Sequence, residues 1–383
     1  MVKDCIFSDI CTDGNGGAIN SAGWEGTTQV YGTIFTRCFG RNGGAFYANK
    51  ARYTYITIDD CEFKDCESNS QNENQGGGAI YLMAEASGLD GIQFNIRNSI
   101  FEECKSNNLE GGAILIKILS FESTCVIDGV QFINCQGTGG GAISNQNEYS
   151  QITINGSSSF TSCSSLSNPG GAIHSILDYV GILIIENTQF ESCSSNSEGG
   201  SIFASVNSGT LSINQVTFIR SSCSQPGSGG AIAIVQQNSY NRISITESSF
   251  TNCQTLPGSS NQYGWGGAIY IFTLIPATEL SSTEFLLTDL SFTNCKASGA
   301  GNNLHILSDD TTAVGNQIKT GSLVTVKDMS NLPNIISDLY TNEWYCFDYM
   351  GINISKADSG NAPFTDHEPL FISPSLTPKF NDP

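Results

Sequence analysis

The segment "FTSCSSLSNPGGAI", at residues 160–173, holds a phenylalanine, a cysteine three residues later, and a glycine pair followed by Ala-Ile. The same words recur along the chain, where seven of nine glycine pairs continue as Ala-Ile. Successive second glycines lie 27, 34, 34, 29, 30, 29, 30 and 37 residues apart. A period of about 31 residues indicates a repeat architecture rather than a set of unrelated domains.

A Phe-x-x-Cys word recurs ahead of the glycine pairs, in eight strict copies and in two looser ones, Phe7/Cys11 and Phe218/Cys223. The strict copies are Phe35/Cys38, Phe63/Cys66, Phe101/Cys104, Phe132/Cys135, Phe160/Cys163, Phe190/Cys193, Phe250/Cys253 and Phe292/Cys295. Segments before each Phe, such as "ITIDDCEF" and "LSINQVTF", alternate apolar and polar residues around a polar bend. Such alternation is typical of half-buried β-strands, so each repeat predicts three short strands, and no segment keeps a helical spacing.

Units of this size cannot each bury their own apolar face, but stacked units bury a continuous one. The prediction is an all-β parallel β-helix over residues 1–331, with about 10–11 coils and a length of roughly 50 Å. The glycines are expected to turn one corner of each coil. Residues 332–383 are aromatic and then Pro-rich. They predict a cap, formed around Trp344 to Tyr349, and an extended tail after Pro363.

The paired words "GGAI" and Phe-x-x-Cys resemble the repeat of the chlamydial polymorphic membrane proteins. The resemblance extends over residues 2–306 and departs from the family at one position, where cysteine stands in place of the usual asparagine. It implies a right-handed, pectin-lyase-like β-helix that is displayed on a cell surface and used in adhesion.

The cysteines predict a ladder of buried, reduced thiols. Ten of the 14 lie in the Phe-x-x-Cys row or its looser copies, and Cys5, Cys61 and Cys125 replace apolar inward residues of other repeats. Disulfides between neighbouring coils are a second hypothesis, because equivalent Cα atoms would lie about 4.8 Å apart. A metal site is a third hypothesis, but Cys-x-x-Cys words and close histidine pairs are both lacking.

The charge distribution excludes nucleic acid and anionic membranes as partners of the central repeats. The net charge is −20, and no Lys or Arg occurs between Lys117 and Arg220. No apolar run reaches the roughly 20 residues of a membrane span. The start, "MVKDCIFSDI", lacks a signal-peptide core and lies in mid-coil. We therefore expect a part of a longer exported protein, located extracellularly or on a cell surface.

The titratable residues predict no catalytic site, no cofactor and no metal. Asp59 and Asp60 lie in a predicted bend, and His174, His305 and His367 are far apart in sequence. The expected function is therefore non-catalytic display or adhesion, with a host, neighbouring-cell or glycan ligand. The alternative is a carbohydrate-binding protein or a polysaccharide lyase or hydrolase, which would need converging carboxylates on one face.

The variable segments carry the candidate ligand residues. Aromatic residues in or beside these segments are Trp24, Tyr149, Tyr179, Tyr240, Tyr263 and Trp265. Among them, Tyr263 and Trp265 are the candidates for sugar contacts. Asn155 and Asn353 begin Asn-x-Ser words and are candidate glycosylation sites if the protein is secreted.

Overall fold

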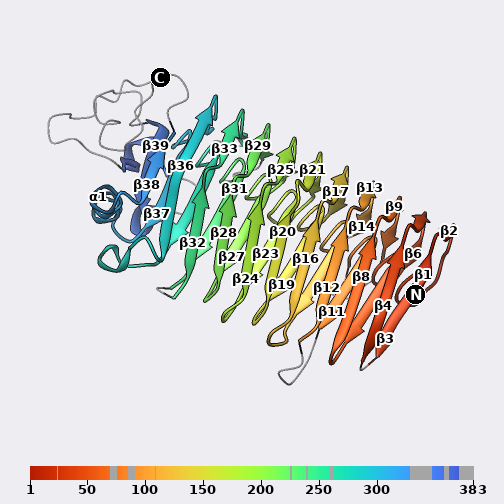
Figure 1. Cartoon of the computed structure of the whole chain (residues 1–383). Helices are drawn as coiled ribbons and strands as arrows, with labels where there is room; N and C mark the ends of the chain where they lie inside the picture. The colour runs from red at the N-terminus through yellow and green to blue at the C-terminus, as the bar shows by residue number, and fades with distance from the viewer. Residues whose placement is uncertain are drawn as a thin grey trace.

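The computed structural model describes residues 1–23, 25–69, 76–84, 91–107, 109–224, 227–238, 240–258, 263–327, 347–357 and 362–370. These residues form a parallel β-helix, in which equivalent strands of successive coils lie side by side along a rod (Figure 1). Eight complete coils run from β4 (Gly26–Tyr31) to β35 (Ile269–Thr273), with incomplete coils at both ends. Each complete coil contains four short strands, one more than the sequence predicted, and fits the expected right-handed β-helix.

The four strands of a coil contribute to sheets that we name A to D in chain order. Sheet A contains β1 (Val2–Lys3), β4, β8 (Thr54–Asp59), β12 (Gln93–Arg97), β16 (Thr124–Asp128), β20 (Gln151–Asn155), β24 (Ile182–Glu186), β28 (Thr210–Asn214), β32 (Arg242–Thr246), β36 (Phe285–Thr293) and β38 (Val324–Val326). Sheet B contains β2 (Ile6–Ser8), β5 (Ile34–Thr36), β9 (Glu62–Lys64), β13 (Ile100–Glu102), β17 (Gln131–Ile133), β21 (Ser159–Thr161), β25 (Gln189–Glu191), β29 (Thr217–Ile219), β33 (Ser249–Thr251) and β36, which joins it to sheet A.

Sheets C and D complete each coil. Sheet C contains β6 (Phe39–Gly40), β10 (Glu67–Ser68), β14 (Lys105–Ser106), β18 (Gln136–Gly137), β22 (Ser164–Ser165), β26 (Ser194–Ser195), β30 (Ser222–Cys223) and β34 (Gln254–Thr255). Sheet D contains β3 (Ile19–Gly23), β7 (Phe46–Lys50), β11 (Ile80–Ala84), β15 (Ile114–Ile118), β19 (Ile143–Asn147), β23 (Ile173–Leu177), β27 (Ile202–Val206), β31 (Ile232–Gln236), β35, β37 (Leu304–Ser308), β39 (Tyr349–Asn353) and β40 (Glu368–Pro369).

Left-handed residues close each coil at three corners. In the coil that contains β8 to β11, these are Asp60 at the bend before the Phe word, Asp65 within it, and Gly77, with φ of 54°, 51° and 68°. Asp adopts this conformation more readily than most residues, and glycine does so at no steric cost. The second glycine has a different role, because a Cβ on Gly78 would lie 2.0 Å from the carbonyl oxygen of Gly112 in the next coil.

Phenylalanine rings form a continuous column inside the rod. Ten rings stack from Phe7 to Phe292 with centroids 4.6–5.2 Å apart and interplanar angles of 2–16°. The two end rings are half-buried and the eight between them are fully buried. Each stacked pair adds about 0.5–1.5 kcal/mol beyond its buried area, so the column fixes the register between coils.

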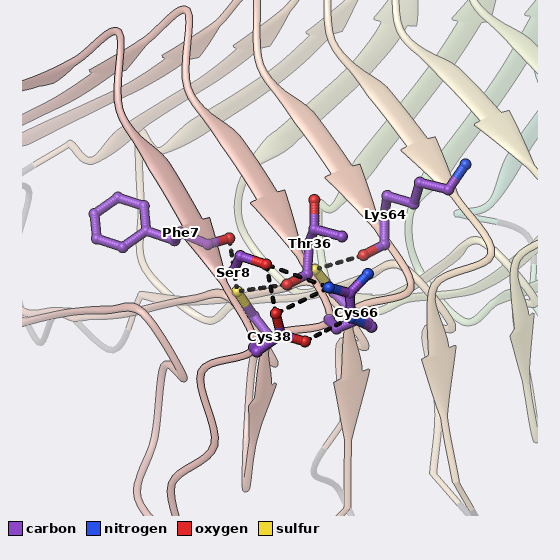
Figure 2. Close-up of polar contacts among 8 residues, drawn as sticks. Phe7, Ser8, Thr36, Cys38, Lys64 and Cys66 are labelled. Atoms are coloured by element: carbon purple, nitrogen blue, oxygen red, sulfur yellow. Dashed lines mark hydrogen bonds and ion pairs between the residues drawn. The ribbon is translucent and has the colours of Figure 1, made fainter.

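The cysteine ladder lies beside this column and bonds to it. Figure 2 shows the Cys38 thiol between two carbonyl groups, where Sγ lies 3.7 Å from the Phe7 oxygen of the preceding coil and 3.9 Å from the Thr36 oxygen. All eight cysteines of the strict words are buried and donate in this way to the preceding coil, with distances of 3.4–3.7 Å. They are Cys38, Cys66, Cys104, Cys135, Cys163, Cys193, Cys253 and Cys295. The thirteen described cysteines carry free thiols.

The ladder is interrupted after Cys193, contrary to the predicted row that continues through the looser word Phe218/Cys223. The Cys193 thiol itself occupies a regular rung, because its Sγ lies 3.4 Å from the Phe160 oxygen and 3.8 Å from the Glu191 oxygen. In the following coil, Ser221 takes the position three residues after Phe218, and Cys223 lies in β30 instead. Cys193 therefore ends one run of thiols, and Cys253 begins another.

The other cysteines outside the strict words lie in separate environments. Cys11, of the first looser word, is exposed, and its backbone forms an isolated parallel β-bridge with Phe39. It is therefore not a rung of the ladder either. Cys125 is buried in β16, and burial raises the pKa of its thiol to about 12. No group of three or more metal-ligating side chains occurs within the described ranges.

The C-terminal end differs from the prediction, because α1 (Thr311–Gly321) packs there although no helix was expected (Figure 1). Asp310 caps the helix through a hydrogen bond from the Ala313 N–H, and Val314 and Ile318 are buried. Sheet D continues beyond residue 331, since β39 pairs with β37 and β40 adds an antiparallel strand. Tyr349 of the predicted cap begins β39, whereas Trp344 and residues 371–383 lie outside the described residues.

Short 3-10 segments complete the described chain: η1 (Ala277–Glu279), η3 (Ile354–Lys356) and η4 (Phe364–Asp366). None of the helices in the described ranges has the length and apolar character required to cross a bilayer.

Candidate functional site

The outer face of sheet D carries two apolar clusters outside the main core. One contains Tyr47, Tyr81 and Leu115, and the other contains Phe203, Ala233, Trp265, Tyr270 and Ile352. Their members occupy the outward positions of the D strands or the residue before a glycine pair, yet all are buried. Chain segments therefore cover much of this face.

Trp265 is one of the two aromatic residues predicted to contact a ligand, and its side chain is buried, with only 4% exposed. Its ring stacks on His305 and meets the edge of His367, each at a centroid distance of 5.0 Å. Residues 362–370, which we call the C-terminal strap, cover Trp265 although they are distant from it in the sequence. Tyr263, the second candidate, is 45% exposed.

The strap brings together two histidines that are 62 residues apart in the sequence. His305 Nε2 and His367 Nδ1 lie 2.9 Å apart, and both side chains are buried. Burial lowers the pKa of His367 to about 4 and lowers that of His305 well below its usual value. Both rings are therefore neutral near pH 7 and serve to attach the strap.

His174 belongs to a separate polar cluster on sheet D. The Ser144 hydroxyl donates to Glu110 at 2.8 Å, and His174 Nδ1 lies 3.7 Å from the other Glu110 oxygen. Burial opposes ionisation of Glu110, but His174, Ser144 and Lys117 together hold the pKa of its carboxyl below the usual value. The serine donates to the carboxylate and not to the imidazole, so this cluster is not an activated nucleophile.

Glu198 occupies the same position before its glycine pair as Glu110 does before its own. Its environment is different, because burial raises the pKa of the Glu198 carboxyl to about 7. Three coils separate the two carboxyl groups, which corresponds to about 14 Å along the rod. Paired glycosidase carboxylates lie roughly 5–9.5 Å apart, so these two do not form such a pair.

The Asp59-Asp60 pair lies in the bend that the sequence predicts. Asp60 has the left-handed conformation of the corner, and the Asp59 carboxylate accepts a hydrogen bond from Asn98 Nδ2 at 2.9 Å. Asp59 therefore joins two coils.

Aromatic rings stack at the turns between sheets D and A in three consecutive coils. The centroid of Phe121 lies 4.1 Å from that of Tyr149, which lies 4.8 Å from that of Tyr179. Phe121 is 44% exposed and Tyr179 is 56% exposed. We call these three residues the aromatic ridge. The sequence pointed to both tyrosines as aromatic residues near variable segments, but it did not point to Phe121 or to the stacking.

The surroundings of the aromatic ridge are acidic. The stretch between Lys117 and Arg220 contains seven Asp and Glu residues and no Lys or Arg. Burial and the neighbouring Asp178 charge raise the pKa of the Glu148 carboxyl. Asp178 itself accepts a hydrogen bond from Asn207 Nδ2 at 2.5 Å. Aromatic and negatively charged groups therefore lie together on this edge of the rod.

The remaining sequence candidates lie in different environments. Asn155 ends β20, where its side-chain oxygen is buried without a hydrogen-bond partner among the described residues. The Asn353 oxygen accepts the Thr311 N–H at 2.6 Å and so connects β39 to α1. Trp24 lies outside the described residues, and Tyr240 is exposed.

The aromatic ridge is the strongest candidate for recognition among the described residues, because stacked rings and acidic side chains lie together there at the surface. Comparisons of the chain with protein-family models, with curated proteins and with solved structures give no match.

Proposed function

We propose that this chain is a non-catalytic display or adhesion module of a secreted or cell-surface protein, and that the aromatic ridge is its recognition surface. The observation that carries the proposal is the stack of Phe121, Tyr149 and Tyr179, in which the two end rings are exposed and Tyr149 is half-buried. The resemblance of the repeat words to those of the chlamydial polymorphic membrane proteins supports the same function. An extracellular location belongs to this proposal.

The solenoid gives such a surface its rigidity. The turns that carry the ridge follow directly after D strands, and those strands pair with the next coil along their whole length. Stacking orients the rings before any ligand arrives, so less conformational freedom is lost on binding. Exposed contiguous apolar groups on a soluble protein commonly mark an interaction site.

Adhesion of the full chain to immobilised cells and to a glycan array tests the proposal. The variant Phe121→Ser/Tyr149→Ser/Tyr179→Asn removes all three rings from solvent-exposed turns. We expect this variant to lose most of the adhesion while its circular dichroism spectrum remains that of the wild type. Tyr55→Thr is the matched control, because it removes an exposed ring from β8, outside the ridge. Wild-type adhesion by the triple variant would refute the proposal.

A carbohydrate-active β-helix enzyme is the second candidate, and the carboxyl of Glu198 favours it. A pKa of about 7 suits a general acid at neutral pH. Release of reducing ends or unsaturated products from a panel of acidic and neutral polysaccharides tests this candidate. An activity that Glu198→Gln abolishes and Tyr179→Asn retains would support the enzyme over the display module.

A further inference from the structure

We propose that the aromatic ridge, together with the carboxylates of Glu148 and Asp178, binds an arginine-bearing basic segment of a partner protein. This inference rests on the proposed function, which it deepens by naming the chemistry of the partner.

The stack ends at Tyr179 with one ring face that no described aromatic residue covers. The other face of the Tyr179 ring lies against Tyr149. The corresponding turn of the next coil is Asn207-Ser208-Gly209, which carries no ring. That turn is narrow, because Gly209 approaches the Gly181 carbonyl so closely that a Cβ would lie 2.5 Å from its oxygen. A planar group from outside can therefore continue the stack at this level.

The backbone of Tyr179 supports a role for the ring beyond packing. Tyr179 has φ of 51°, in the left-handed region that a bulky side chain rarely adopts. Asparagine or glycine would satisfy this turn with less strain. The ring is more than half exposed, so burial does not compensate for the conformational cost.

The charges beside Tyr179 select a cation. Burial and the neighbouring Asp178 charge both raise the pKa of the Glu148 carboxyl, so the two carboxyl groups lie close to each other. The sequence between Lys117 and Arg220 supplies no Lys or Arg of its own to neutralise them. A cationic group between the two carboxylates would relieve their repulsion. Nucleic acid and anionic lipid carry the wrong charge for this surface.

Arginine fits both features better than lysine or a neutral sugar does. Its guanidinium is planar, stacks on aromatic faces and donates two parallel hydrogen bonds to a carboxylate. Lysine has the charge but not the flat face, and a neutral sugar has no charge. Cation–π contacts contribute about 0.5–2 kcal/mol, depending on how far water is excluded.

Fluorescence anisotropy with three labelled Gly-Ser peptides tests the inference on the full chain. The peptides contain three arginines, three lysines or three citrullines at the same positions. We expect the arginine peptide to bind about tenfold more tightly than the lysine peptide, and the citrulline peptide to bind weakly or not at all. Its affinity should fall as NaCl is raised from about 50 to about 300 mM, because exposed charge pairs are screened.

Two variants separate the ring from the charge. Tyr179→Asn should weaken arginine-peptide binding about tenfold without destabilising the turn. Glu148→Gln/Asp178→Asn should weaken it further and flatten its salt dependence. The matched controls are Tyr55→Thr, which removes an exposed ring from β8, and Glu186→Gln, which removes a charge from the same basic-free stretch. Both controls should bind like the wild type.

The outcomes distinguish this inference from the proposed function. Equal binding of the arginine and lysine peptides, unaffected by Tyr179→Asn, would indicate unspecific charge attraction and overturn the inference. Ridge-dependent binding of the citrulline peptide or of a neutral glycan, but not of the arginine peptide, would overturn it and leave the display function standing. If cell adhesion is also unchanged in the triple ridge variant, the proposed function fails as well.

Discussion

The hydroxyl oxygens of Ser201 and Ser221 lie 2.7 Å apart inside the rod, and both side chains are fully buried. Ser201 stands in the one Gly-Gly word that has serine in place of alanine. Ser221 stands at the ladder position that Cys193 and Cys253 occupy in the preceding and following coils. The two serines that depart from the repeat therefore compensate each other, because each buried hydroxyl is the hydrogen-bond partner of the other.

This pair predicts a strong coupling in stability. Ser201→Ala should destabilise the protein by about 1–3 kcal/mol, since it leaves a buried hydroxyl without its partner. Ser201→Ala/Ser221→Cys restores both repeat words and should recover most of that loss. Urea unfolding of the single and double variants gives the coupling energy. Additive effects of the two substitutions would contradict the interpretation.

The cysteine ladder predicts selective thiol reactivity. Among the described cysteines, Cys11 is exposed and Cys5 is half-buried, whereas the other eleven are buried. Alkylation of the native protein should therefore modify Cys11 and Cys5 within minutes and the ladder only after denaturation. Mass spectrometry of proteolytic peptides measures this, with Cys11→Ser as the control. Rapid native labelling of Cys135 or Cys193 would disprove the buried ladder.

The buried environment of Glu198 predicts that the variant Glu198→Gln is more stable than the wild type at high pH. Its folded pKa of about 7 lies above the ordinary value of 4.5, so the folded state holds a proton that the unfolded state has lost between these pH values. Stability from this group is therefore full below about pH 4.5 and declines as the pH rises to 7. Glu198→Gln should gain about 1–3 kcal/mol at pH 8 and nothing at pH 4.5.

Glu110→Gln is the matched control for this experiment. The pKa of Glu110 is lowered in the folded state, so its charge stabilises the fold above the ordinary pKa. The glutamine variant should therefore lose stability at pH 8, opposite in sign to Glu198→Gln. Thermal unfolding at pH 4.5, 6 and 8 measures both. A shared sign for the two variants would contradict the different environments of these carboxyls.

The histidine pair predicts that acid releases the C-terminal strap. Both histidines have folded pKa values below the ordinary 6.5, so the released state binds more protons as the pH falls from 6.5 toward 4. Attachment is thus complete above pH 6.5 and weakens below it. Asp366 acts against this by raising the pKa of His367, and the 2.8 Å ion pair of Lys356 with Glu368 also holds the strap.

Hydrogen exchange of residues 362–370 measures this release. Exchange should accelerate between pH 6.5 and 4, after correction for the intrinsic pH dependence of exchange. His367→Gln keeps a hydrogen-bonding side chain that does not titrate in this range, so its exchange should depend less on pH. An identical pH profile in the variant would show that other groups govern the strap.

The sequence predicted those parts of the fold that repeat. The strict Phe and Cys words recur at inward positions, and the glycine pairs recur at a corner, so periodicity alone located them. The break after Cys193 was not foreseen, because Cys223 lies close enough to Phe218 in the sequence to resemble a rung. The helix α1, with Asp310 as its N-cap, belongs to no repeat. A segment outside the repeat leaves no period to detect.

The candidate site was less predictable, because it depends on contacts between turns and on distant segments. Trp265 looked accessible in a variable loop, and the strap that covers it begins nearly one hundred residues later. Tyr149 and Tyr179 were noted as separate loop residues. Their stacking with Phe121 depends on how the turns of successive coils lie beside one another, which the spacing of the repeat words does not reveal.

The three left-handed corners have a consequence for how such a rod changes its length. Because every coil closes on itself, a duplication or deletion of one whole coil leaves the ladders in register, whereas a partial one disrupts all of them. The rod can thus lengthen or shorten only in steps of about 4.8 Å. The distance between the aromatic ridge and the C-terminal strap is therefore quantised, and related rods should differ in reach by whole steps.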